Sequence, residues 1–82
     1  MAVTPVRLEL DGDANSAYVV LSDDEVKKTK KLDQNRLLDL DAQGEVVGIE
    51  FLNISAGVNL SDLPRGEELR KLFGEHHIRQ FA

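Results

Sequence analysis

Short apolar stretches separated by turn-forming residues run through the first two-thirds of the chain. Residues 6–10 (VRLEL) carry apolar side chains at every second position, with charges between them. Residues 17–21 (AYVVL) form an almost continuous run of β-branched and aromatic side chains, which is typical of a central strand. The loop at 11–16 (DGDANS) consists almost wholly of turn formers. This pattern predicts two strands joined by a tight loop.

Three further strands are predicted between residues 25 and 52. Residues 25–32 form a strand by position but a poor one by composition, since lysines fall on both faces. Residues 36–40 (RLLDL) and 45–52 (EVVGIEFL) are better strands, and in the second of these every other residue from Val47 to Phe51 is apolar. Connections of two to six residues predict an antiparallel meander of about five short strands rather than a parallel α/β sheet.

The pattern changes to a helical period after a loop at residues 53–60. Ser61 or Asp62 can cap a helix over residues 61–75, with Pro64 tolerated in the first turn. One face of this helix carries Leu69, Leu72, Phe73 and His76 at helical spacing. We expect this face to pack on the apolar face of the sheet, because an uncovered face would leave an exposed patch.

The predicted fold class is therefore α+β, with a sheet over residues 5–52 and one C-terminal helix packed on it. Residues 76–82 are either a frayed tail or a docking segment. The length of 82 residues is sufficient for one domain, so residues 1–82 are expected to form a single unit.

Composition excludes several functional classes. The chain has no cysteine, which removes disulfides and cysteine-bound zinc. It shows no cofactor motif, no signal-peptide pattern and no apolar run near the roughly 18 residues that a membrane helix needs. We therefore expect a cytoplasmic protein that contacts no membrane and needs no cofactor.

Residues 39–50 (DLDAQGEVVGIE) come close to a calcium-binding loop. Asp39, Asp41, Gly44 and Glu50 stand at loop positions one, three, six and twelve. The residues after Gly44 favour a strand, however, and a calcium loop of this kind needs a helix on each side. We interpret the segment as a hairpin in which Asp41 and Gly44 shape the turn, and we predict no metal site here.

Other chemistry-bearing groups have a structural and a functional interpretation. The adjacent pair His76 and His77 points about 100° apart on a helix, which suits a shared metal poorly. Loop carboxylates can perform acid–base or metal-dependent chemistry in a pocket, but on an acidic surface they are usually solvated. These loop carboxylates are Asp11, Asp13, Asp23, Asp24 and Glu25.

The net charge is −5, yet the run KKTKK at residues 27–31 holds four of the ten basic residues. Its lysines can protect a strand edge from aggregation, steer an acidic protein partner, or contact nucleic acid. Nucleic acid is disfavoured, because the body is acidic and no aromatic residue lies within the run. The candidate partner-binding residues are Lys27, Lys28, Lys30 and Lys31.

Two segments resemble a family of small prokaryotic proteins catalogued as domain of unknown function 2283. Residues 11–23 (DGDANSAYVVLSD) are similar to its acidic loop and following strand, and residues 36–55 (RLLDLDAQGEVVGIEFLNIS) to its D-x-D-x-x-G-x-(V/L)-x-G-I-E segment. The resemblance covers about residues 5–55 and implies a small antiparallel sheet with a helix. It supplies no catalytic residues, and it implies an antitoxin-like or other partner-binding role for some relatives.

Together these observations predict a protein of unknown function that is not an enzyme and acts as a protein–protein interaction module. The partner is another protein or a second copy of the chain. A small metal-dependent enzyme or regulator that uses the acidic loops is the first alternative, and a nucleic-acid binder that uses the lysine run is the second.

Overall fold

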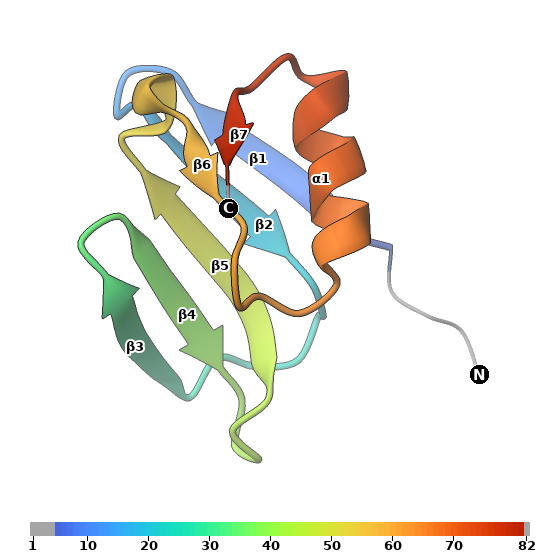
Figure 1. The fold of residues 1–82 in the computed structure, drawn as a ribbon. Coiled ribbons are helices and arrows are strands. Elements are labelled where there is room, and N and C mark those ends of the chain that lie inside the picture. The colour runs from blue at the N-terminus through green and yellow to red at the C-terminus, as the bar shows by residue number, and fades with distance from the viewer. Residues whose placement is uncertain (1–4, 82) are drawn as a thin grey trace.

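A computed structural model describes residues 5–81 of the chain. Its main element is an antiparallel sheet in which the five strands follow the spatial order β1-β2-β5-β4-β3 (Figure 1). The predicted α+β class, an antiparallel sheet with one C-terminal helix, is confirmed. The strands span Arg7–Asp11 (β1), Ser16–Val20 (β2), Lys28–Asp33 (β3), Arg36–Leu40 (β4) and Val46–Leu52 (β5).

The strand order differs from that of a simple meander. Strands β1 and β2, and strands β3, β4 and β5, are neighbours in chain order, but β5 also pairs with β2 and places Ile49 opposite Val19. The chain leaving β2 passes the end of β5, where the Leu21 N–H donates to the carbonyl of Val47 at 2.9 Å, before it reaches the far edge at β3. Periodicity predicts which segments are strands, but it carries no information about which distant strands pair.

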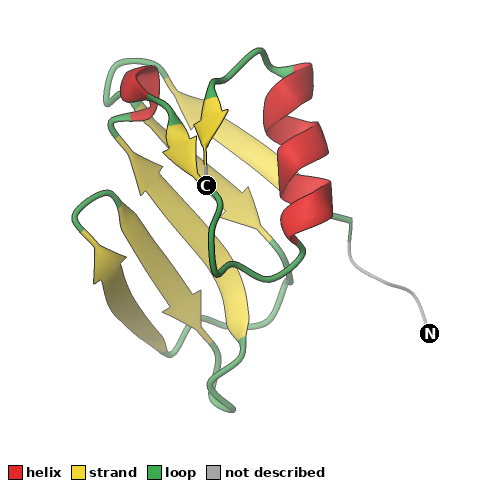
Figure 2. Ribbon diagram, in the orientation of Figure 1, coloured by secondary structure: helices red, strands yellow, loops and turns green. Residues whose placement is uncertain are grey.

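A second layer covers one face of this sheet (Figure 2). It contains the 3₁₀ turn η1 (Ile54–Ala56), β6 (Val58–Asn59), α1 (Gly66–Glu75) and β7 (Gln80–Phe81). β6 and β7 pair in parallel, so residues 80 and 81 form a docked segment rather than a frayed tail. Neither short strand has enough alternation to be visible in the sequence.

α1 begins at Gly66, later than the expected start at residue 61. The N–H and hydroxyl of Ser61 both donate to Oδ1 of Asn59, at 2.9 and 2.7 Å, so this side chain is not a helix cap. Asp62 and Arg65 have φ angles of 62° and 56°, in the left-handed region. Left-handed residues interrupt a right-handed helix, which therefore starts only after Arg65.

The core lies between the second layer and the sheet. Leu69 and Phe73 of α1 are both 0% exposed, and the Phe73 ring meets Phe51 edge-on with the centroids 5.1 Å apart. His76 does not extend this face as expected: it is exposed, because α1 ends at Glu75. The half-buried Ile78 packs against the core in its place.

The hairpin interpretation of residues 39–50 is confirmed. Oδ1 of Asp41 accepts the backbone N–H groups of Gln43 and Glu45, both at 2.9 Å, and Gly44 has a φ of 81°. The Asp41 carboxylate is thus used inside the β4–β5 turn, while Glu50 lies well along β5. Separately, no helix within residues 5–81 is long and apolar enough to cross a bilayer.

Candidate functional site

The second layer lies on one side of the sheet (Figure 1), and the strand registers define a row of side chains on the opposite side. The strand registers place Glu9 beside Tyr18, Tyr18 beside Glu50, Glu50 beside Leu37, and Leu37 beside Lys31. Because side chains alternate along a strand, this row points away from the buried core. We call this surface the open face; it comprises this row and the adjacent row Arg7, Val20, Gly48, Asp39 and Thr29.

Tyr18 leans from the first row of the open face into the second. Its hydroxyl donates to Oδ2 of Asp39 at 2.6 Å, and the Thr29 hydroxyl donates to Oδ1 of the same carboxylate at 2.7 Å. The phenol crosses β5 at Gly48, where a Cβ atom would overlap the Tyr18 hydroxyl and lie 2.5 Å from its Cζ. A glycine inside a strand often marks such a close approach. Hydrogen bonds between side chains therefore tie β2 and β3 to β4.

This arrangement raises the pKa of the Tyr18 hydroxyl far above its ordinary value of about 10. Partial burial is the largest cause; the hydrogen bond to Asp39 and the negative charges of Asp39, Glu9 and Glu50 add to it. A raised pKa means that the folded state holds the proton more tightly. The resulting stabilisation is complete below about pH 10 and is lost as the pH rises through the folded pKa.

Tyr18 is the only tyrosine and the chain has no tryptophan, so its ionisation can be followed by phenolate absorbance. We expect the midpoint pH of the wild-type absorbance titration to lie above that of free tyrosine. Asp39→Asn should lower the midpoint, because it removes a negative charge and the carboxylate acceptor. Gly48→Ala should lower it too, because the new Cβ displaces the phenol.

Asp24→Asn is the matched control, since Asp24 is an exposed loop carboxylate that is not among the groups that raise the pKa of Tyr18. Its titration should coincide with that of the wild type. Circular dichroism on the same samples establishes that each variant is folded across the titrated range. An Asp39→Asn midpoint equal to the wild-type value would contradict the assigned role of Asp39.

The four lysines predicted as partner contacts lie at one end of the sheet, on and just before β3. Lys28 and Lys30 are on the side that carries the second layer, whereas Lys31 is on the open face. Lys27 precedes β3, and its Nζ lies 2.7 Å from Oε1 of Glu25. All four are exposed, and β3 is the last strand of the sheet. We call this group the lysine edge. Its four charges lie close together along one margin of the sheet, but they point to two different faces.

The loop carboxylates do not converge. Asp11 and Asp13 precede β2, whereas residues 23–25 follow it. Oδ1 of Asp11 accepts the N–H of Ala14 at 3.1 Å, which is a local turn contact. Among residues 5–81, no three His, Asp or Glu side chains form a group that could hold a metal ion. His76 and His77 are both exposed.

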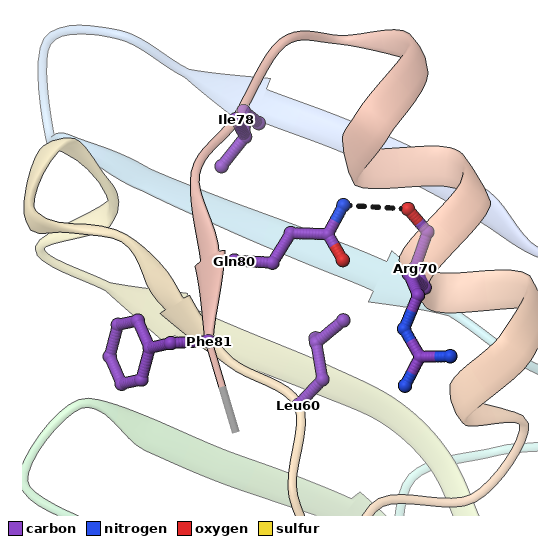
Figure 3. A pocket seen from close by; sticks show the side chains of 5 residues that line it. All are labelled: Leu60, Arg70, Ile78, Gln80 and Phe81. Atoms are coloured by element: carbon purple, nitrogen blue, oxygen red, sulfur yellow. Dashed lines mark hydrogen bonds between the residues drawn. The ribbon is translucent and has the colours of Figure 1, made fainter.

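A hollow of about 450 Å³ lies beside α1 and β7 (Figure 3). Within it, Nε2 of Gln80 donates to the backbone carbonyl of Arg70 at 2.7 Å. This bond links the two-residue strand β7 to the helix, which helps to hold β7 in place. The lining residues are Leu60, Arg70, Ile78, Gln80 and Phe81.

Arg36 is a buried residue that was not predicted from the sequence, and it is only 6% exposed. Its Nε and Nη2 contact Oδ2 of Asp33 at 2.8 and 2.7 Å, and its Nη1 donates to the carbonyls of Asn59 and Ser61 at 3.2 and 2.7 Å. Arg36 therefore joins the β3–β4 turn to the second layer. Side chains two residues apart on a strand share a face, so Arg36 lies on the same side as the inward-facing Leu38. This spacing was the available sequence signal of its burial.

These features define a small α+β domain whose sheet has one covered face, one open face and a lysine edge. The family described as "Protein of unknown function (DUF2283)" matches residues 7–55, more than half of the chain, and the protein belongs to this family. The matched segment contains all five strands of the large sheet, and thus the whole open face. No curated protein matches the chain. No solved structure matches it either.

Proposed function

We propose that the protein acts without catalysis, as a cytoplasmic module that binds another protein through the lysine edge. The position of β3 carries this proposal: it is the terminal strand of the sheet, and its lysines are exposed on an otherwise acidic molecule. A terminal strand offers backbone N–H and C=O groups to an added strand. A basic edge also accelerates the approach of an acidic partner.

The charges of this edge make it selective. Pairing β3 with β3 of a second copy would place lysines near lysines, and like charges across neighbouring strands are destabilising. An acidic strand or loop meets no such repulsion. The same lysines that prevent pairing between identical edges therefore favour a partner of opposite charge.

Site-specific photo-crosslinking in the source cells tests this proposal. A photo-reactive residue in place of Lys30 should give a discrete adduct with one other protein, whereas the same residue in place of the exposed Lys71 on α1 should not. Adding Lys28→Glu should weaken the adduct from position 30. Equal adduct patterns from positions 30 and 71 would overturn the proposal.

A further inference from the structure

We propose that the open face is an interface between two copies of this chain, which associate face to face about a two-fold axis. The inference goes beyond the proposed function and concerns a different surface, because the lysine edge is the margin of the sheet and the open face is its broad side. Lys31 belongs to both surfaces, whereas Lys28 and Lys30 point to the other side of the sheet.

The open face carries apolar groups on both sides of its middle strand and opposite charges on its outer strands, with the Glu50 carboxylate between the apolar groups. Tyr18 on β2 and Leu37 on β4 are half-buried and flank β5, the middle strand. Glu9 and Lys31 are exposed and stand on the two outer strands.

The two margins carry opposite charges in the same row, and this makes the face complementary to itself. A two-fold axis that runs along β5 in the plane of the interface exchanges β1 with β3 and β2 with β4. Glu9 then faces Lys31 of the second copy, Lys31 faces its Glu9, and Tyr18 faces its Leu37. Every off-axis contact in the row occurs twice, as an isologous interface requires.

Two further groups affect the strength of this association. The Arg7 Nε lies 3.8 Å from Oε2 of Glu9, but both side chains are 59% exposed, so this pair is weak and leaves Glu9 accessible. Glu50 stands on the middle strand and therefore meets its own copy near the axis. This like-charge contact opposes association, and Glu50→Gln should relieve it.

Tyr18 lowers the entropic cost of association because its side chain is already fixed. The hydroxyl is held by Asp39, and Asp39 is held in turn by Thr29. Preorganised aromatic side chains lose little conformational freedom when a partner binds.

The area of the face sets the expected affinity. Five strands at a spacing of about 4.8 Å, each about five residues long at about 3.3 Å per residue, present roughly 400 Å² per copy. Stable complexes usually bury about 800 Å² per partner. The dimer is therefore weak and reversible, and it forms only at high protein concentration.

Sedimentation equilibrium with charge-reversed variants tests the geometry. Wild-type protein should show a monomer–dimer equilibrium, and Glu9→Lys or Lys31→Glu alone should each weaken dimerisation by about tenfold or more, since each turns two attractive pairs into repulsive ones. A mixture of the two variants should restore dimerisation, because in the mixed dimer positions 9 and 31 again face opposite charges at both ends. Glu50→Gln should tighten the wild-type dimer.

The Lys28→Glu/Lys30→Glu variant separates this inference from the proposed function. It should leave the dimer intact while reducing cross-linking at the lysine edge. A wild-type chain that stays monomeric at every concentration would overturn the inference and leave the proposed function standing. Failure of the mixture to dimerise, assembly beyond dimers, or weaker association of Glu50→Gln would each overturn the two-fold arrangement. Circular dichroism checks that the variants fold.

Discussion

Phe73→Ala is expected to lower the free energy of unfolding by about 3–5 kcal/mol. Phe73 is 0% exposed, and its ring meets Phe51 edge-on at 5.1 Å, so truncation removes apolar contacts and leaves a cavity between α1 and the sheet. The native state of an 82-residue domain is typically more stable than the unfolded state by only about 4–12 kcal/mol. Urea denaturation followed by circular dichroism should therefore show a greatly lowered midpoint.

Leu72→Ala supplies the comparison within the same helical turn. Leu72 is only half-buried, so the loss should be clearly smaller than that of Phe73→Ala. Phe73→Leu should also cost less, because it retains most of the apolar contacts. A loss below about 1 kcal/mol for Phe73→Ala would show that α1 contributes little to the core.

Arg36→Met is expected to destabilise the fold by about 1–3 kcal/mol, the usual effect of leaving backbone acceptors without their donor. The substitution leaves the carbonyls of Asn59 and Ser61 without their guanidinium donor and Asp33 without its cation. Arg36→Lys should be intermediate, because one ammonium cannot reproduce the planar fork that reaches both the carboxylate and the carbonyls. Urea denaturation of the wild type, Arg36→Met and Arg36→Lys measures these differences in the free energy of unfolding.

The same site predicts a difference in acid stability. The hydrogen bond from Arg36 is the main cause that lowers the pKa of the Asp33 carboxyl, so Asp33 contributes stability above its unfolded pKa of about 3.9 and loses it as the pH falls through the lower folded pKa. Because Asp33 is 43% exposed, solvent screening keeps this contribution small. Arg36→Met should lack this part of the acid dependence. If the stability of Arg36→Met fell with decreasing pH as steeply as that of the wild type, this would contradict the assigned pairing of Arg36 with Asp33.

Strand positions and the β4–β5 turn were predictable because they depend on residues close together in the sequence. The alternation around Val47 and Phe51, and the pairing of Asp41 with Gly44, required no knowledge of distant contacts. The start of α1 was predicted too early, although the contact that competes with helix capping is also local. Asn59 takes both donors of Ser61, and that competition is not visible as a helix signal.

The open face was hidden in the sequence because its groups come from separate strands. Tyr18 and Asp39 are brought together only because β5 lies between β2 and β4, and because Gly48 leaves room for the phenol. A glycine inside an apolar strand was the one local signal for this close approach. The lysine run and its division between two faces were visible in the strand alternation, but the side of the sheet that each lysine takes depended on the register of β3 against β4.

The pairing of β2 with β5 also bears on the order in which the chain folds. β1–β2 and β3–β4–β5 are each joined by short turns, so each can form from nearby residues. Pairing β2 with β5 requires the chain between Val19 and Ile49 to close into a loop. The chain entropy lost in this closure is offset only after the core contacts have formed. We expect this closure to be the slow step, so that Val19→Ala slows refolding more than it speeds unfolding in stopped-flow experiments.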